Sequence, residues 1–358
     1  MKRTITISIE QLSRPQPGGI ATYVRGLAAG LRDLADPTLD VVGVAPKGFK
    51  NNDSLPLRVV TAPVGVRALS RLWPIVPLGV PRDSNVVHAT SMAGPFAGGR
   101  SDAVHSIAMH DLLWRDAPGI STPAGVRFHD RQLKLIADRT DLRVIVTSPG
   151  LAVRLVDVGI EAARIHSVRL GVGDGNANAS SETSVHELLA SHGVHGPFTL
   201  YAGTIETRKN IERLIEAHRI ASARIPDLGT LVLVGPKGWG EVATGDTTLL
   251  GLVSREALLG LYRDATVFAY VPLAEGWGLP PVEALNVGTR VVASSTTPSV
   301  ATNERVVLVD PLDVEGIADG LLAALRQGDD DESQSARRQS VADLTWRNVA
   351  LDHLAAWQ

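Results

Sequence analysis

The stretch "AEGWGLPPVEAL", residues 274–285, places two glutamates, Glu275 and Glu283, eight positions apart in the chain. It follows "TVFAYV", an apolar run typical of a buried strand, and it contains Pro280-Pro281, which a helix tolerates only at its start. The glycines between the glutamates leave backbone N–H groups open to a ligand. We therefore predict a strand, a ligand-binding loop and a helix with Glu283 in its first turn, because doubly wound sheets bind ligands where strands lead into helices. Two carboxylates beside open N–H groups suit a ligand rich in hydroxyls.

The rest of the chain repeats this alternation in two blocks. Runs such as "LDVVGVA" and "LRVIVTS" alternate with helical patterns in the first block, and "FTLYAGT" and "GTLVLVG" restart the alternation in the second. Strands that are apolar throughout indicate parallel sheets covered on both faces. A Gly/Asn/Ser-rich junction at 171–184 separates the blocks. The 358 residues therefore predict an α/β protein with two doubly wound, Rossmann-like domains.

Composition excludes several classes of protein. Hydrophobic residues make up 44% of the chain, which suffices for sizeable cores, and no cysteine is present for a disulfide or a thiolate metal site. No run of about 18 apolar residues occurs, and the N-terminal segment lacks the apolar core of a signal peptide, so we expect a cytoplasmic protein without a membrane span. We expect no nucleic-acid partner for a chain of net charge −3.

Charge is distributed unevenly between the two halves. Residues 1–175 carry 21 Lys and Arg against 15 Asp and Glu, whereas residues 176–358 carry 14 against 23. Within the basic half, "VGVRALSRLWPIVPLGVPR" at 64–82 mixes arginines with Trp73 and many aliphatic residues. This stretch is interpreted either as a peripheral contact with the inner face of a membrane or a lipid acceptor, or as an ordinary connection with a short helix.

Two further loops follow predicted strands. In "RPQPGGIATYV", Gly18 and Gly19 precede a helix; paired glycines let backbone N–H groups approach a phosphate, although strand–helix turns use glycine in any case. In "YAGTIETRKNIERLIEAH", Arg208 and Lys209 precede a helix. A cation pair at this position suits an anion lying between it and the helix end, and the alternative is a solvated surface pair. His110, which ends "SIAMH", is either a buried core histidine or a ligand contact.

Longer stretches of the second half resemble the retaining glycosyltransferases of family four, which have the GT-B fold. The resemblance is nearly continuous over about 198–325, through "GTIETRKNIERLIEA", "LGLVSREALLGLYRDATVFAYVPLAEGWGLPPVEALNVGTRVVAS" and "VLVDPLDVEGIADGL". It is looser in the first half, through "GGIATYV", "HAT" and "MHDLLW". The resemblance implies an acceptor-side domain over 1–172, a donor-binding domain over 173–340, and a C-terminal helix in 341–358 that packs back on the first domain.

In the second domain, the resemblance implies that both glutamates contact a nucleotide-sugar donor. Glu283 would hold the ribose hydroxyls, and Glu275 would hold the transferred sugar and steady developing charge. Arg208 and Lys209 would bind the diphosphate. The backbone groups that would complete the donor site belong to Val253, Gly276, Trp277, Gly278 and Leu279.

In the first domain, the resemblance implies a smaller set of contacts. Gly18 and Gly19 would approach the diphosphate, and His110, oriented by Asp111, would contact the transferred sugar. The residues with an implied catalytic role are His110, Glu275, Arg208 and Lys209.

The implied activity is transfer of a hexose, with retention, from a nucleotide-diphospho-sugar to a hydroxyl of a glycan, a lipid-linked or a small-molecule acceptor. No metal or other cofactor would be required, because cations and helix dipoles would stabilise the departing diphosphate. The form "GTIE-x-RKN" is most similar to the mannosyltransferase members, so we expect GDP-mannose first and other GDP- or UDP-linked sugars as alternatives. Two other classes stay open: a nucleotide-sugar epimerase or hydrolase of the same fold, and a non-catalytic nucleotide-sugar-binding protein.

Two positions depart from the family pattern. Ser299 stands after Pro298 where the family usually has a glutamate, and the loop at 299–305 is shorter, which puts its acceptor or base contacts in doubt. Arg290 replaces the usual proline of "GTPVVAS". We expect its side chain to be solvated or to face the binding cleft.

Overall fold

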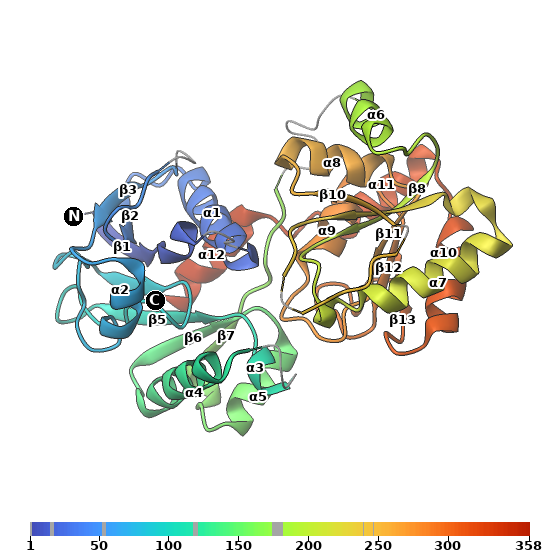
Figure 1. Ribbon diagram of the computed structural model, residues 1–358. Helices are drawn as coiled ribbons and strands as arrows, with labels where there is room; N and C mark the ends of the chain where they lie inside the picture. Colours follow the sequence, from blue (N-terminus) through green and yellow to red (C-terminus); the bar gives the residue numbers. More distant parts are fainter. Residues whose placement is uncertain are drawn as a thin grey trace. The chain divides into compact units, whose positions relative to one another are not determined.

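The computed structural model describes residues 2–14, 18–51, 55–116, 121–173, 182–238, 240–245 and 247–358. The chain forms two compact units: one consists of Met1–Gly171 with Leu344–Gln358, and the other of Val172–Asp343 (Figure 1). Each unit is a parallel sheet with helices on both faces, which is the α/β architecture predicted from the apolar strands.

The strands of the first unit form one sheet in which every pair is parallel. They are β1 (Arg3–Ser8), β2 (Leu39–Ala45), β3 (Arg58–Thr61), β4 (Val86–Ala89), β5 (Val104–Met109), β6 (Leu142–Val146) and β7 (Ile165–Ser167). Their order is β3-β2-β1-β4-β5-β6-β7. The order reverses between β1 and β4, so the loops after these strands lie at the switch point where such sheets bind ligands.

Helices cover both faces of this sheet. They are α1 (Gly18–Asp33), α2 (Val66–Leu72), α3 (Leu113–Asp116), α4 (Pro123–Asp138), α5 (Pro149–Asp157) and α12 (Trp346–Ala356), with short 3-10 turns η1 (Glu10–Ser13) and η2 (Ala162–Arg164). Ser and Thr residues cap α4, α5 and α12, each accepting a hydrogen bond from a backbone N–H of the first turn.

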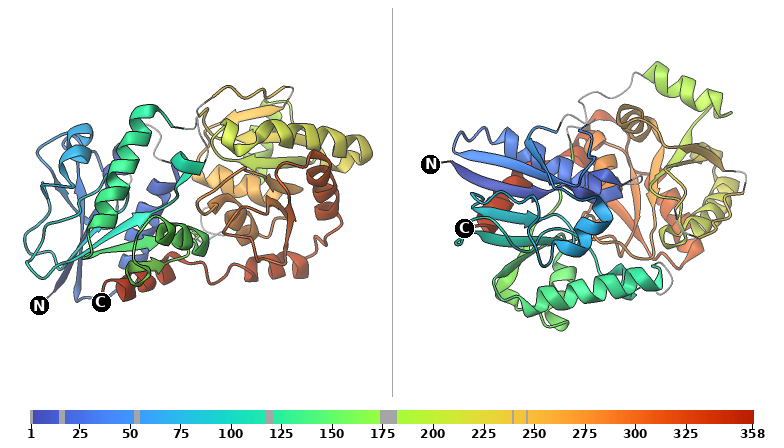
Figure 2. Two further views of the ribbon diagram at one scale, coloured as in Figure 1. Left: turned by 90° about the horizontal axis from the view of Figure 1, so that it is seen from below. Right: turned by 60° about the vertical axis from the view of Figure 1, so that its left-hand side comes forward.

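The C-terminal helix α12 packs beside α1 (Figures 1 and 2). Small residues on α1 allow the close approach: a Cβ on Gly26 would lie 2.1 Å from the Trp346 ring, and one on Gly30 would lie 2.0 Å from the Trp346 carbonyl oxygen. Just after α12, the fully buried Trp357 donates from its indole Nε1 to Ser106 Oγ at 2.8 Å. The last residues of the chain therefore complete the core of the first unit.

The second unit has its own parallel sheet. Its strands are β8 (Phe198–Ala202), β9 (Thr230–Val234), β10 (Thr248–Gly251), β11 (Val267–Tyr270), β12 (Val291–Ser294) and β13 (Val306–Val309). The order is β10-β9-β8-β11-β12-β13, which reverses between β8 and β11. The loops that carry the predicted cation pair and Glu275 follow these two strands, so they share one switch point.

The helices of the second unit are α6 (Glu182–Ser191), α7 (Ile211–Arg224), α8 (Arg255–Asp264), α9 (Leu279–Val287), α10 (Val314–Leu325) and α11 (Asp331–Gln339), with 3-10 turns η3 (Thr207–Lys209) and η4 (Pro226–Leu228). Helices α7 and α10 pack against each other (Figure 1). Helix α9 packs against both α8 and α11. In α9 the buried residues lie on all sides, because this helix is enclosed by its neighbours.

The basic stretch 64–82 contains α2, and the structure divides its hydrophobic residues. Trp73 is fully buried against Val44 and Leu69, and its Nε1 donates to the Leu78 carbonyl oxygen at 2.9 Å. The tryptophan is therefore not available to a lipid surface, contrary to one interpretation of the sequence. Across the described residues, the structure contains no helix with the length and apolar character needed to cross a bilayer.

Candidate nucleotide-sugar site

The cation pair lies in a tight turn at the switch point of the second unit. Arg208 and Lys209 end η3, and α7 begins two residues later, at Ile211. Between them Asn210 adopts the left-handed conformation, with φ of 59°. Its buried Nδ2 donates to the Val271 carbonyl oxygen at 3.0 Å and to that of Pro311 at 2.6 Å. These bonds fix the turn to the loop after β11, and therefore bring the cations to Glu275.

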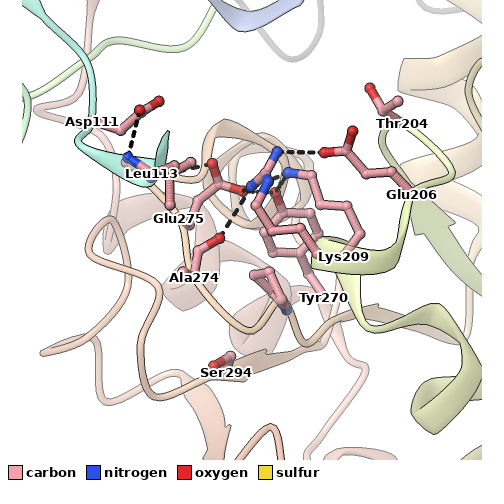
Figure 3. Close-up of polar contacts among 12 residues, drawn as sticks. Asp111, Leu113, Thr204, Glu206, Lys209, Tyr270, Ala274, Glu275 and Ser294 are labelled. Carbon is pink, nitrogen blue, oxygen red and sulfur yellow. Dashed lines mark hydrogen bonds and ion pairs between the residues drawn. The ribbon is translucent and has the colours of Figure 1, made fainter. Parts of the chain in front are cut away.

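Glu275 is held by three donors at one oxygen (Figure 3). Lys209 Nζ lies 2.5 Å, Tyr270 Oη 2.5 Å and Arg208 Nη1 3.4 Å from Glu275 Oε2. Lys209 Nζ also donates to Tyr270 Oη at 2.6 Å. The other oxygen, Oε1, accepts the backbone N–H of Gly276 at 3.2 Å. The geometry leaves Oε1 as the side of the carboxylate with capacity for another donor.

Two opposing effects set the protonation state of Glu275: burial favours the protonated acid, and the two neighbouring cations favour the carboxylate. Burial alone would raise the pKa of Glu275, but Lys209 and Arg208 outweigh it and lower the pKa to about 2. Burial lowers the pKa of Lys209, and Glu275 offsets this only in part because Arg208 repels the same ammonium. Glu275 is therefore a carboxylate at neutral pH, and the pair is asymmetric because the acid has two cationic partners while the lysine has one carboxylate in contact.

The structure adds two residues that the sequence interpretation did not include. Glu206 Oε1 accepts from Arg208 Nη2 at 2.6 Å, and Tyr270 links Lys209 to Glu275. Two carboxylates thus face two cations, so the pair is neither solvated nor an uncompensated anion site. Glu206 stands two residues before Arg208 in the same motif, whereas Tyr270, on a buried strand, has the sequence pattern of an ordinary core residue.

The loop before α9 exposes backbone donors. Gly278 has φ of 93°, and a Cβ there would lie 2.5 Å from Thr297 Cγ2, so only glycine fits. In the part of the chain that the structure describes, the N–H groups of Trp277, Gly278 and Leu279 donate to no protein acceptor. Ser299, at the position where the family has a glutamate, donates from Oγ to the Gly278 carbonyl oxygen at 2.6 Å. The serine that replaces the family's glutamate therefore helps to hold the loop before α9 in place.

Glu283 has a separate set of partners. Arg255 Nη1 donates to Glu283 Oε1 at 2.7 Å, and Tyr262 Oη donates to Oε2 at 3.2 Å. The prediction that Glu283 lies in the first turn of its helix is wrong. Helix α9 begins at Leu279 and has no acidic residue in its first turn. The helix dipole at the N-terminus therefore does not account for this carboxylate, and the cation on α8 balances its charge.

A pocket of about 750 Å³ lies in the second unit. The loops after β9 and β10 line it, and its charged lining residues are Glu212, Lys237 and Glu241. Glu212 Oε1 accepts the backbone N–H of Ala243 at 2.9 Å, which ties α7 to the rim of the pocket. Val253 lies one residue after the pocket-lining Leu252 and just before Ser254, the N-cap of α8.

The remaining predicted residues belong to the first unit. Gly18 and Gly19 begin α1, where both are exposed; Gly18 has φ of 62°, and a Cβ on either would meet no atom of the described residues within 4 Å. The positive φ requires glycine at 18, whereas Gly19 has room for a side chain. The open space at both positions is compatible with a ligand at this helix end.

His110 follows β5, and its tautomer is set by the backbone. Its Nε2 lies 2.9 Å from the carbonyl oxygen of Thr90, which can only accept, so the neutral ring carries its proton on Nε2. The lone pair of Nδ1 then remains as an acceptor. Burial lowers the pKa of His110, which favours this neutral form. Asp111, the next residue, accepts the N–H of Leu113 at its Oδ1 at 3.0 Å (Figure 3).

A buried chain of hydrogen bonds lies behind His110, whose ring is 5.0 Å from that of Tyr23. His353 Nδ1 faces the Val349 carbonyl oxygen at 2.7 Å and must donate, so its Nε2 accepts from Tyr23 Oη at 2.7 Å. Tyr23 then accepts from His88 Nε2 at 2.7 Å, and His88 Nδ1 accepts from a serine of β5. Each of the two histidines thus donates from one ring nitrogen and accepts at the other, so both are neutral. Burial lowers the pKa of His353 to about 4.

Arg290 corrects another expectation. Its side chain is largely buried, and it donates to the carbonyl oxygens of Gln327 at 3.0 Å and Thr266 at 3.3 Å. It also pairs with Asp329 at 3.3 Å. The guanidinium therefore binds β12 to the segment between α10 and α11, and it is not a solvated cation. Among the residues described, no group of His, Asp and Glu side chains is arranged to hold a metal ion.

Known proteins resemble this chain in both sequence and fold. Residues 196–327 match the family described as glycosyl transferases group 1. The O-antigen chain mannosyltransferase B of Escherichia coli is 32% identical over 174 residues, which cover 45% of this chain and 45% of that protein. The chain therefore spans less than half the length of this relative.

Solved structures align over nearly the whole chain. A sucrose-phosphate synthase from Thermosynechococcus elongatus has a TM-score of 0.71 at 20% identity, covering 99% of this chain and 98% of the other. The HepE protein of Anabaena, in complex with UDP and glucose, has a TM-score of 0.70 at 16% identity with the same coverage. At such identities the structures establish the fold. The chain has the GT-B fold, and its residues 196–327 are similar to the glycosyl transferases group 1 family and to mannosyltransferases.

Proposed function

We propose that the chain is a retaining, metal-independent glycosyltransferase that moves a hexose, with mannose favoured, from a nucleotide-diphospho-sugar to an acceptor hydroxyl. The observation that carries the proposal is the arrangement around the start of α9. Two largely buried carboxylates, Glu275 and Glu283, are each held by a cation and a tyrosine. The N–H groups of residues 277–279, which stand between them in the sequence, donate to no acceptor among the residues that the structure describes. This arrangement offers hydroxyl acceptors at two points and anion donors between them, as a nucleotide-diphospho-sugar requires.

The diphosphate would lie between the cation pair and the helix ends. Arg208 can exchange its 3.4 Å contact with Glu275 for a phosphate oxygen while it keeps the 2.6 Å bond to Glu206. The N–H groups of Trp277 and Gly278, together with the N-terminus of α9, would add donors that need no reorganisation. Preorganised donors of this kind stabilise the charge that develops as the leaving group departs, without a metal ion.

The base would occupy the pocket of about 750 Å³, whose lining residue Leu252 stands three positions before Arg255, the partner of Glu283. Carboxylates of Glu212 and Glu241 line it, and they can accept from the ring N–H and amino group on the Watson–Crick edge of guanine. Val253 would add backbone contacts. Together with the similarity to an E. coli mannosyltransferase, these acceptors favour GDP-mannose over UDP-linked sugars.

On the side of the first unit, His110 would contact the transferred sugar. With its proton held on Nε2 by Thr90, the neutral imidazole can accept a hydrogen bond from a sugar hydroxyl at Nδ1. Gly18 and Gly19 would leave the N-terminus of α1 open to the diphosphate. Each of these contacts is a binding or orienting interaction, and none requires His110 to act as a charged acid.

A lipid-linked acceptor is the finer proposal for the partner, with the reaction on the cytoplasmic face of a membrane. It rests on the exposed residues of 64–82: Ile75 is 68% exposed and Val76 42% exposed, near the exposed arginines Arg67 and Arg71. Aliphatic and basic side chains together suit an anionic lipid surface. Co-sedimentation with vesicles containing anionic lipid should fall when Ile75 is changed to Ser; equal binding would remove this surface from the proposal.

The test of the proposed function begins with a thermal-shift screen of GDP, UDP, ADP and dTDP on the wild type and on Glu283→Ala. A nucleotide at about 100 times its dissociation constant should add about 2.7 kcal/mol of stability. A shift with one nucleotide that the variant loses supports the donor site. No shift with any nucleotide, in folded protein, would overturn it.

The matching sugar nucleotide then separates the remaining classes. Incubation with the donor and a mannose-type acceptor should give a glycoside whose anomeric configuration matches that of the donor sugar. Conversion of the donor to an isomer or to free sugar without any acceptor would instead identify an epimerase or hydrolase. Binding without any turnover over all acceptors would favour the non-catalytic class.

A further inference from the structure

The side chains around Glu283 form a small cluster that faces one side of α8. Arg255 is the first residue of α8, and Tyr262 follows seven positions later, so both lie on the same face of that helix. This face packs against α9, where the side chain of Glu283 is 9% exposed. Each carboxylate oxygen has its own donor, Arg255 Nη1 at 2.7 Å for Oε1 and Tyr262 Oη at 3.2 Å for Oε2.

Both donors are themselves fixed. Tyr262 is fully buried, its ring lies edge-on to that of Phe268 at 5.1 Å, and its carbonyl oxygen accepts from Thr289 Oγ1 at 2.6 Å. Burial raises the pKa of Tyr262 well above its ordinary value, so its hydroxyl stays a donor. Burial would lower the pKa of Arg255, but Glu283 reverses this and raises it. Neither donor can be lost by titration near neutral pH.

We propose that Arg255 and Tyr262 are positioning residues that orient Glu283 so that each of its oxygens presents one lone pair to one hydroxyl of the ribose diol. A carboxylate offers about four acceptor positions, and the two protein donors direct the group while leaving capacity on both oxygens. This inference rests on the proposed function, in which Glu283 holds the ribose. Arg255 and Tyr262 then determine selectivity for ribonucleotides without touching the nucleotide themselves.

Charge balance explains why a cation is needed here. A carboxylate that is mostly removed from water is stable only if it is paired and hydrogen-bonded. Without Arg255, Glu283 would keep a single neutral donor, Tyr262, and its carboxylate would be free to rotate. Rotation moves a lone pair away from one of the two positions that would accept ribose hydroxyls. The loss therefore falls on the hydroxyl contacts and not on the base or the diphosphate.

The experiment measures the ratio of dissociation constants for 2′,3′-dideoxy-GDP and GDP on the full chain, or the uridine pair if the screen selects UDP. In the wild type, hydrogen bonds to a charged acceptor should favour the ribonucleotide by about tenfold to a hundredfold. Arg255→Ala should reduce this ratio to within about threefold of one, Arg255→Lys should restore part of it, and Tyr262→Phe should give an intermediate ratio. Thermal melts would establish that each variant is folded.

The matched control is Arg263→Ala, because Arg263 lies on the same helix, is 42% exposed against 44% for Arg255, and pairs with Asp264 at 3.1 Å. Its ratio should equal that of the wild type. If Arg255→Ala and Tyr262→Phe also keep the wild-type ratio while Glu283→Ala abolishes it, the positioning role is overturned and the proposed function stands. If the wild type itself shows no preference for the ribonucleotide, the ribose role of Glu283 fails, and this inference fails with it.

Discussion

The two signature glutamates of the second unit, eight residues apart, are held in similar ways but in different surroundings. Each carboxylate has a tyrosine hydroxyl and a basic side chain as partners: Tyr270 and Lys209 for Glu275, Tyr262 and Arg255 for Glu283. The lysine beside Glu275 is 9% exposed, whereas the arginine beside Glu283 is 44% exposed. One pair is therefore nearly dry, and the other is open to water at its cation.

The two glutamates differ in how much of their acceptor capacity the protein itself uses. Glu275 has a second cation, Arg208, and three donors on one oxygen, so its charge is compensated inside the protein. Glu283 has one donor on each oxygen and therefore keeps acceptor capacity on both. In energetic terms, disturbing the Glu275 cluster should mainly change folding stability, and disturbing the Glu283 cluster should mainly change nucleotide binding.

The largest expected effect is on stability, from Lys209→Met. This change keeps the volume of the side chain but leaves the buried Glu275 with Arg208 at 3.4 Å as its remaining cation. Removing one partner of a buried pair typically costs about 3–5 kcal/mol, because the other charge stays desolvated. Urea unfolding of the variant should show this loss, and the double change with Glu275→Gln should recover most of it. An equal loss in Arg255→Met would break the comparison between the two clusters.

A slightly smaller effect is expected on the acid side of the stability curve. The pKa of Glu275 falls from its ordinary value of 4.5 to about 2 in the folded protein. The carboxylate therefore contributes stability that is fully present above pH 4.5 and is lost as the pH falls toward 2, about 3 kcal/mol in all. The difference in unfolding free energy between the wild type and Glu275→Gln should shrink over this window. A difference that is independent of pH would contradict the assigned charge state.

Next in size is the effect of neutral replacements on nucleotide affinity. Glu275→Gln frees Arg208 and Lys209 from a negative partner, so GDP should bind at least as tightly as to the wild type, while transfer falls by about a hundredfold or more. Glu283→Gln should weaken GDP by about tenfold, because a hydroxyl bond to a charged acceptor is replaced by a neutral one. Calorimetric titration of both variants checks the pair. Equal weakening by the two changes would show that the clusters are not functionally distinct.

The smallest expected effects come from the two tyrosines. Tyr270→Phe removes one of three donors at Glu275 Oε2, and the cost should be about 1 kcal/mol because two cations remain. Tyr262→Phe removes the donor that the structure places on Glu283 Oε2, so its effect should be larger on nucleotide affinity than on melting temperature. Parallel melts and titrations of the two variants measure this. The reverse pattern would contradict the assignment of Glu275 to stability and Glu283 to binding.

Much of the fold could be predicted from local patterns. Apolar runs such as "TVFAYV" and the proline pair at 280–281 predicted strand β11 and the start of α9, because period and backbone constraints act over a few residues. The short edge strand β10 was not predicted, since its four residues are only partly buried and carry a weak pattern. Glu283 lies just beyond the first turn in which it was predicted, because the helix begins at Leu279, directly after a left-handed glycine.

The candidate site was predictable as a set of motifs, and its pairing was not. Glu275, Arg208 and Lys209 were recognised by their positions after strands, and the structure brings them into contact. Tyr270 was hidden by the pattern of its strand, and Arg255 by its place at the start of a helix, where a basic residue has no favourable dipole. Burial also changed two interpretations, because Arg290 and Trp73 face the protein interior.

The sequence by itself determined the two doubly wound sheets, the loops that carry the candidate site residues, and the similarity to the glycosyl transferases group 1 family. These follow from periodicity, glycine and proline positions, and motif spacing, all of which act along the chain. Only the tertiary structure decided which charges compensate each other. Lys209, after β8, pairs with Glu275, after β11, and Arg255 of α8 pairs with Glu283 of α9. The physical reason is that the energy of a charge depends on its burial and on partners from other segments, and neither quantity is encoded in the order of neighbouring residues.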